Sequence, residues 1–147
     1  MKDRFIALQV ILGYHFHDKE LLTEALTHPT FANESQQGDI SSNQRLEFLG
    51  DSVLGMVVAE YLYKKYANSF EGELTQRRSL LVNKNNLGNK AKEMDLSQYL
   101  LLGKGEAKMD GGKNLTNLSG ALEAIIGAIY IDGGFEEAKK FIVQKLI

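Results

Sequence analysis

Asn43-Gln44-Arg45-Leu46-Glu47-Phe48-Leu49-Gly50-Asp51-Ser52-Val53-Leu54-Gly55 opens a helical pattern that continues to about Tyr66. Apolar residues occupy nearly every face of this segment, which predicts a buried helix. Two carboxylates interrupt the apolar surface, because Glu47 and Asp51 are four residues apart and therefore lie on one face, one turn from each other. An unpaired buried carboxylate is unfavourable and two like charges repel, so we expect a positive group beside them.

The composition limits the classes of protein to consider. The chain has 147 residues, 44% of them apolar, which suits one domain, residues 1–147, with one core. No segment reaches the ~18 continuous apolar residues of a membrane span and the start lacks a signal-peptide pattern, so we expect a cytoplasmic protein without a membrane partner. The absence of cysteine excludes disulfides and thiolate chemistry. A net charge of −2 means that a bound polyanion would need a local basic patch or a metal.

Two shorter helices are expected before the central segment. The pattern predicts one over residues 3–12 and another over 19–27, with Asp18 as the N-cap of the second. His28-Pro29 ends the second helix, because a residue before proline avoids the helical region. The histidine could be a ligand or a general base. No acidic partner stands beside it in the sequence, however, and we interpret it as a structural residue that ties down the next loop.

The stretch from residue 30 to residue 42 is mainly polar and has almost nothing to bury. We interpret it as a mobile loop. It ends in Ser41-x-x-Gln44, a capping-box pattern that would begin the central helix.

The segments after the central helix are also predicted to be helical or connecting. We expect one helix over residues 72–94 and a short helix or turn over 95–102. Residues 103–113 hold four glycines and three lysines. A phosphate-binding loop is unlikely there, because the segment follows no strand and lacks the Gly-Lys-Ser/Thr ending. We interpret it as a flexible, basic connector.

A second highly apolar helix is predicted near the end of the chain. Caps within Asn114–Asn117 would begin it, and it would run to about Ile131 with Glu123 as its only charge. A last amphipathic helix follows over residues 135–147. Since no strand, hairpin or repeat signal is found, we predict an all-α fold.

The two most apolar helices thus carry isolated acids, Glu47 and Asp51 on one and Glu123 on the other. If the helices pack together, the three carboxylates can converge. Oxygen ligands without His or Cys nearby suit Mg²⁺ or Mn²⁺ and not zinc. The alternative is that each acid has its own Lys, Arg or backbone partner, and the residues alone leave both interpretations open.

Five motifs in order and spacing resemble those of the ribonuclease III nuclease domain. They are residues 43–55, Ala25-Leu-Thr-His-Pro29, Glu71-Gly-Glu-Leu74, Gly103-Lys-Gly-Glu106 and Ala121-Leu-Glu-Ala-Ile-Ile-Gly-Ala-Ile-Tyr-Ile-Asp-Gly133. The resemblance covers essentially the whole chain. It implies an all-helical, homodimeric nuclease domain that hydrolyses double-stranded RNA with Mg²⁺, or Mn²⁺ as a substitute, in RNA processing. The cuts would be staggered and would leave 5′-phosphate and 3′-hydroxyl ends. The family's C-terminal double-stranded-RNA-binding domain has no counterpart among these motifs.

The resemblance also implies roles for single residues. Glu47, Asp51 and Glu123 match metal-site carboxylates, with Asp51 and Glu123 in the catalytic role. Phe48 matches a residue that inserts into the partner subunit, although an ordinary core phenylalanine is an equally good interpretation without the resemblance. The residues expected to contact RNA, for most of which ordinary solvated surface is the alternative, are Gln44, Glu71, Arg77, Arg78, Lys84, Lys104, Lys108 and Lys113.

Two positions depart from the family pattern. Gly120 stands where the family usually has an aspartate of the metal-site group, and Gln44 stands where it usually has glutamate. We therefore expect weaker metal binding and a higher Mg²⁺ requirement. The alternative is a catalytically impaired dimer that acts as an RNA-binding or RNP-assembly protein, and a third interpretation is a helical interaction domain unrelated to RNA.

Overall fold

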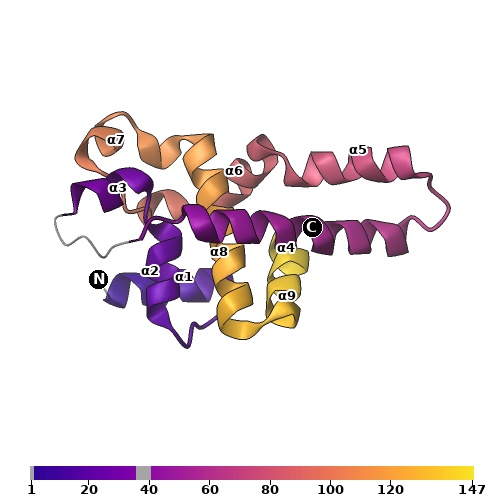
Figure 1. The fold of residues 1–147 in the computed structure, drawn as a ribbon, viewed down its shortest axis with the longest axis horizontal. Helices are drawn as coiled ribbons and strands as arrows, with labels where there is room; N and C mark the ends of the chain where they lie inside the picture. The colour runs from indigo at the N-terminus through magenta and orange to yellow at the C-terminus, as the bar shows by residue number, and fades with distance from the viewer. Residues whose placement is uncertain (1, 36–40) are drawn as a thin grey trace.

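The computed structural model describes residues 2–35 and 41–147. Within these ranges the chain forms helices and one isolated backbone bridge between Thr27 and Leu101, which confirms the predicted all-α class (Figure 1). No helix in the same ranges is long and apolar enough to cross a membrane. The helices are α1 (Lys2–Leu12), α2 (Lys19–Leu26), α3 (Pro29–Glu34), α4 (Gln44–Lys65), α5 (Glu71–Val82), α6 (Lys84–Glu93), η1 (Leu96–Gln98), α7 (Lys104–Lys108), η2 (Gly111–Lys113), α8 (Leu115–Gly133) and α9 (Phe135–Lys145).

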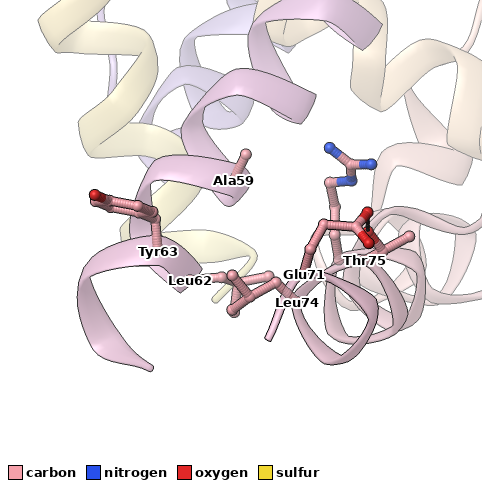
Figure 2. A pocket seen from close by; sticks show the side chains of 7 residues that line it. Ala59, Leu62, Tyr63, Glu71, Leu74 and Thr75 are labelled. Atoms are coloured by element: carbon pink, nitrogen blue, oxygen red, sulfur yellow. Dashed lines mark hydrogen bonds between the residues drawn. The ribbon is translucent and has the colours of Figure 1, made fainter. Parts of the chain in front are cut away.

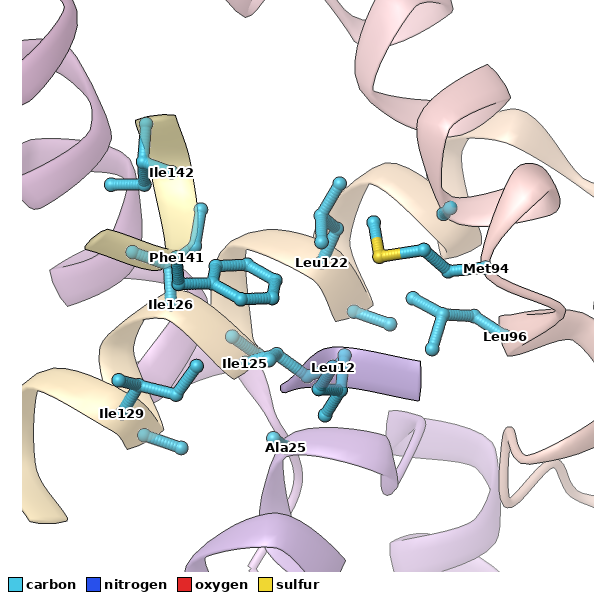
Figure 3. Close-up of a cluster of buried hydrophobic side chains, with 14 of the residues drawn as sticks. Leu12, Ala25, Met94, Leu96, Leu122, Ile125, Ile126, Ile129, Phe141 and Ile142 are labelled. Carbon is cyan, nitrogen blue, oxygen red and sulfur yellow. The ribbon is translucent and has the colours of Figure 1, made fainter. Parts of the chain in front are cut away.

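Helix α8 forms the centre of the core. It packs against α2, α4, α6 and α9, and its apolar side chains have no exposure from Leu118 to Ile129. Figure 3 shows Leu122, Ile125 and Ile126 of α8 among side chains from α1, α9 and the region around η1. Burying each such side chain contributes about 1.5–3 kcal/mol. A helix that is apolar all round is therefore stable here, as the sequence predicts.

Helices α4 and α8 touch backbone to backbone where they cross. A methyl group on Gly50 would lie 2.7 Å from the carbonyl carbon of Glu123, and it would overlap the carbonyl oxygen. A methyl group on Gly127 would overlap the carbonyl oxygen of Leu46 in the same way. Only glycine allows this approach, and it fixes the α4 carboxylates beside Glu123.

The predicted capping box does not begin α4. The helix starts at Gln44 after Asn43, whose side chain makes no capping hydrogen bond. Asn43 is instead buried and tied to α2, because its backbone N–H donates to the carbonyl of Thr27 at 2.8 Å. Its side-chain amide also donates to the carbonyl of Ala25 at 3.2 Å. These bonds fix the chain at residue 43, so α4 begins directly after it and Ser41 lies outside the helix.

The predicted loop from residue 30 to residue 42 is partly helical. Pro29 is the first residue of α3, and the His28 side chain accepts a hydrogen bond from the N–H of Thr30 as its N-cap. Proline is favoured at this position, because its missing N–H would be unpaired there anyway. His28-Pro29 therefore ends one helix, as predicted, and begins the next. Residues 36–40 of the predicted loop lie outside the described residues.

The single helix predicted over residues 72–94 is divided at Asn83 into α5 and α6. The Asn83 side chain accepts from the N–H of Asn86 at 2.8 Å and donates to the carbonyl of Ser79 at 3.1 Å. It thereby caps both helices, which is the usual reason that asparagine interrupts a helix. Figure 1 shows α5 turning back along the second half of α4.

The predicted connector over residues 103–113 is ordered as α7 and η2. Glu106 attaches this segment to α8, because its carboxylate accepts a hydrogen bond from the Asn117 amide at 2.9 Å. The backbone of Gly111 packs against the same glutamate. These contacts with a buried helix order a segment whose glycines indicated flexibility.

One face of α4 is exposed, which contradicts the prediction that this helix is buried all round. Phe48, Met56 and Tyr63 are 79%, 62% and 72% exposed. They recur at intervals of seven or eight residues and therefore lie along one stripe of the helix. The opposite side of α4, which includes Leu54 and Val58, is buried against the core.

Candidate active site

A pocket at the start of α4 collects the predicted metal-site acids. Gln44, Glu47, Phe48 and Asp51 of α4 and Glu123 of α8 line it. Three carboxylates thus meet in one place, and no basic side chain is among the described residues that line it. The alternative that each acid has a separate cationic partner is not favoured by this arrangement.

The carboxylates of the pocket strongly influence one another. Burial, a hydrogen bond with Asp51 and the negative charges of Asp51 and Glu47 raise the pKa of Glu123 to about 8. Burial and the charge of Asp51 also raise the pKa of Glu47. Glu123 and Glu47 are half-buried, while Asp51 is exposed at the rim. The pocket therefore favours a proton or another cation between its carboxyl groups.

The donor chemistry of the pocket fits a hard divalent cation. Carboxylate oxygens are the ligands that Mg²⁺ and Mn²⁺ prefer, and Mg²⁺ usually keeps several waters beside one or two carboxylates. Within residues 2–35 and 41–147, no three His, Asp or Glu side chains are already arranged so that they could hold one ion. Closing the site on a metal would therefore require side-chain rotations.

Gly120 lies on α8 beside the pocket. A methyl group on Gly120 would lie 2.8 Å from Oε2 and 3.3 Å from Oε1 of Glu47. The Glu47 carboxylate therefore occupies the space that a side chain at position 120 would take.

Comparison with known proteins shows the family of the chain. The family model described as Ribonuclease-III-like matches residues 18–147. The chain belongs to the ribonuclease III family.

Among relatives of this family, Ribonuclease 3 of Carboxydothermus hydrogenoformans is 43% identical over 143 residues, which cover 97% of this chain and 61% of the relative. Ribonuclease 3 of Symbiobacterium thermophilum is 47% identical and is matched over 92% of this chain and 56% of its own length. The chain thus spans little more than half the length of these relatives. The nuclease domain of ribonuclease III from Campylobacter jejuni superimposes with a TM-score of 0.88 and 42% identity, covering 95% of this chain and 93% of that one.

A hydrogen-bond network at His28 joins the ribonuclease III motifs and was not foreseen from the sequence. The N–H of Thr30 donates to His28 Nδ1 at 3.1 Å, and His28 Nε2 lies 3.0 Å from Asn117 Oδ1. The Asn117 amide donates to Glu106 and to the carbonyl of Gly111, so its oxygen must face the histidine. These partners assign the proton of a neutral ring to Nε2. The structural role predicted for His28 is confirmed. The sequence signal for this network was Asn117, which belongs to the run Asn114–Asn117 that we interpreted only as helix caps.

Glu71 lies apart from the acid pocket of the same chain. It lines a separate hollow between the end of α4 and the start of α5, together with Leu74 and Arg78 (Figure 2). Its carboxylate accepts a hydrogen bond from the Thr75 hydroxyl at 2.8 Å. Among the described residues lining this hollow Glu71 is the single carboxylate, so the pocket at Glu123 is the better candidate for ribonuclease III chemistry.

The cationic candidates are spread over α5, α6, α7 and η2. Arg77 is partly engaged, because it pairs with Glu73 at 3.2 Å and stacks on the Tyr66 ring at 3.9 Å. The other basic candidates are exposed, and they are Arg78, Lys84, Lys104, Lys108 and Lys113.

Proposed function

We propose that the chain is a Mg²⁺-dependent endoribonuclease that hydrolyses double-stranded RNA. The observation that carries this proposal is the meeting of Glu47, Asp51 and Glu123 in one pocket without a basic side chain, in a member of the ribonuclease III family. Relatives named Ribonuclease 3 support the same reaction class.

The three carboxylates would hold the cation through oxygen atoms. When bound, Mg²⁺, or Mn²⁺ in its place, neutralises phosphate charge and lowers the pKa of a bound water. Binding of the cation would release the proton that the raised pKa of Glu123 favours, which makes the oxygens of Glu123 available. Hydrolysis joins the water oxygen to phosphorus and breaks the bond from phosphorus to O3′. The products are a 5′-phosphate and a 3′-hydroxyl end.

A second copy of the chain would complete the enzyme. The stripe formed by Phe48, Met56 and Tyr63 exposes three large apolar side chains along one face of α4. Pairing of two such stripes around a two-fold axis would bury it and would place one acid pocket on each side of the axis. Two related sites would cut the two RNA strands at staggered positions. The nuclease domain of Campylobacter jejuni ribonuclease III likewise has a structurally flexible region involved in dimer formation.

RNA would be held by shape and charge. Exposed lysines and arginines on α5, α6 and α7 can reach phosphates and 2′-hydroxyl groups without reading sequence. Because this binding would depend on contacts between cations and phosphates, we expect it to weaken steeply as salt is added. The net charge of −2 should keep the affinity modest.

A catalytically impaired RNA-binding or RNP-assembly dimer is the second candidate. It is favoured by Gly120, which provides no carboxylate, and by the absence of a ready-made metal site among the described residues. The two candidates share the fold and the RNA surface. They differ in whether bound RNA is cut.

Incubation of the protein with a long RNA duplex, a single-stranded RNA and a DNA duplex of the same sequence tests the proposal. We expect Mg²⁺ or Mn²⁺ to support cutting of the RNA duplex alone, with 5′-phosphate ends and staggered positions, and excess chelator to stop it. RNA binding without cutting at any metal concentration would instead support the second candidate. Cutting in excess chelator would contradict the role of the metal.

A further inference from the structure

A groove between the second half of α4 and the last helix, α9, combines an apolar floor with basic edges. Val57 of α4 and Val143 of α9 line it, the first buried and the second half-buried. Three lysines line the same groove, and they are Lys64, Lys65 and Lys139. The aliphatic stems of lysines can lie on an apolar surface while their ammonium groups stay in water. A ligand in this groove would therefore meet apolar contacts and positive charge together.

A carboxylate of the chain itself already lies among these lysines. Glu60 Oε1 is 2.7 Å from Lys139 Nζ and 4.0 Å from Lys64 Nζ. Lys139 is thus paired within the chain, whereas Lys64 is 69% exposed and only distantly paired. The arrangement shows that a carboxylate on a protein side chain can reach the cations of the groove.

Lys65 has no carboxylate partner among the described residues. Its Nζ lies 3.3 Å from the Tyr61 hydroxyl and 5.4 Å from the centre of the Tyr61 ring, contacts that leave its charge in place. The groove holds three lysines and one glutamate, an excess of two positive charges in a chain whose net charge is −2. A local charge opposite to that of the whole chain favours an acidic partner at this place.

The groove is separate from the acid pocket and from the apolar stripe at Phe48. Asp51 and Glu60 are nine residues apart, about 2.5 turns, and so point to opposite sides of α4. None of the described residues that line the groove belongs to the stripe. An RNA duplex presents mainly phosphates and ribose hydroxyls, which offer no large apolar group to the valines of the floor. A protein segment can supply both carboxylates and an apolar side chain.

We propose that the groove between α4 and α9 is a docking site for an acidic segment of a partner protein, in which a large apolar side chain is flanked by aspartate or glutamate. The apolar side chain would lie on Val57 and Val143, and the flanking carboxylates would pair with Lys64 and Lys65. Clustered cations that bind acidic motifs, and grooves that bind apolar anchors, are common modes of peptide recognition. The inference does not depend on RNA cleavage, because it uses no residue of the acid pocket.

Fluorescence anisotropy with labelled peptides and the full chain tests the inference. The acidic probe is fluorescein-Gly-Asp-Glu-Leu-Asp-Glu-Phe-Asp-Glu-Gly. One control probe has serine in place of leucine and phenylalanine, and a second has lysine in place of every acid. We expect a Kd on the order of 100 μM for the acidic probe and at least about tenfold weaker binding of both controls. The amide signals of Lys139 and Val143 should shift in nuclear magnetic resonance spectra as the acidic probe is added.

Charge reversal at the edge of the groove locates the binding. Lys65→Glu should raise the Kd of the acidic probe about tenfold, because it puts a negative charge where a carboxylate would pair. Lys64→Glu, at a second exposed lysine, should act in the same direction. Lys92→Glu on α6 is the matched control, since Lys92 is exposed and has no ion pair among the described residues. Thermal melts report whether each variant is folded.

No binding of the acidic probe at millimolar concentration, equal binding of the three probes, or unchanged affinity in both folded charge-reversal variants would overturn the inference. Two other results would assign the groove to a different occupant and would also overturn it. Lys65→Glu could weaken binding of an RNA duplex in excess chelator without affecting the probe, which would make the groove part of the RNA surface. It could instead weaken association of two chains in sedimentation analysis, which would make the groove an interface between copies.

Discussion

Gly50 lies against the backbone carbonyl of Glu123, so that α4 and α8 meet without a side chain between them. Glu47 precedes this contact by three residues, and Asp51 follows it by one. The closest approach of the two central helices therefore also assembles the acid pocket. Packing and chemistry depend on the same glycine.

Gly50→Ala should separate the helices. Its methyl group would overlap backbone atoms, which cannot move as the end of a flexible side chain can. We expect the free energy of unfolding to fall by at least about 2 kcal/mol, measured by urea denaturation. Gly72→Ala is a control in open space, where we expect no loss and a gain of up to about 1 kcal/mol. Equal effects of the two substitutions would show that the helices do not meet as described.

Phe48→Glu should weaken association of two chains. A charge within a paired apolar stripe is costly, whereas Phe48 contributes little to the fold of one chain because it is 79% exposed. Sedimentation analysis should show at least a tenfold weaker dimer, by order of magnitude, with unchanged circular dichroism. Leu80→Glu on α5, at a residue that is 66% exposed, is the control for a charge placed elsewhere. Loss of association in the control alone would move the interface to α5.

Glu123 should make the metal-free protein less stable as the pH rises. Burial, the hydrogen bond with Asp51 and the neighbouring charges raise its pKa from 4.5 to about 8. The folded state therefore holds this proton more tightly than the unfolded state does. The resulting stabilisation is fully present below pH 4.5 and is lost as the pH rises through about 8.

Urea denaturation in excess chelator measures this effect. Between pH 5 and pH 9, the wild-type protein should lose roughly 1–2 kcal/mol relative to Glu123→Gln, since solvent screens a half-exposed carboxyl group. Parallel curves for the two proteins would contradict the raised pKa of Glu123.

Asp132 should stabilise the fold down to strongly acidic pH. Its side chain, 3% exposed, accepts hydrogen bonds from the Tyr14 hydroxyl at 2.6 Å and from the N–H groups of His17 and Asp18 at 2.8 and 2.9 Å. Burial acts to raise the pKa of Asp132, but these hydrogen bonds outweigh it and lower the pKa to about 2. The stabilisation is present above pH 3.8 and is lost as the pH falls through about 2.

Asp132→Asn tests this role. The amide group of asparagine would point its N–H hydrogens at groups that are themselves hydrogen-bond donors. We expect a loss of about 1–3 kcal/mol in urea denaturation at pH 7. The difference between the two proteins should shrink as the pH approaches 2. A constant difference over the whole pH range would show that the carboxylate charge is not the cause.

The sequence predicted the parts of the site that depend on helical periodicity. The 3.6-residue period places Glu47 and Asp51 on one face, and the apolar run around Glu123 indicates the central helix. Their meeting in one pocket followed from packing the two most apolar helices together. The roles of these acids in binding metal remain predictions.

Other features depend on contacts between distant residues, which a local pattern does not contain. From the sequence, Asn83 could either continue one helix or cap two separate helices. Its hydrogen bonds to Ser79 and Asn86 show that it caps two. The apolar stripe at Phe48 and Met56 looks the same in sequence whether a core or a partner covers it. The fit of Glu47 over Gly120 likewise requires the structure, because the two residues are on different helices.

The most direct test of the account is the single-turnover rate on an end-labelled RNA duplex in Mg²⁺ for wild type, Glu123→Gln and Glu136→Gln. Glu136 is an exposed residue of α9 and serves as the matched control. We predict that Glu123→Gln lowers the rate by at least about 100-fold while Glu136→Gln leaves it unchanged. Equal rates for wild type and a folded Glu123→Gln protein would show that the pocket between α4 and α8 is not the active site.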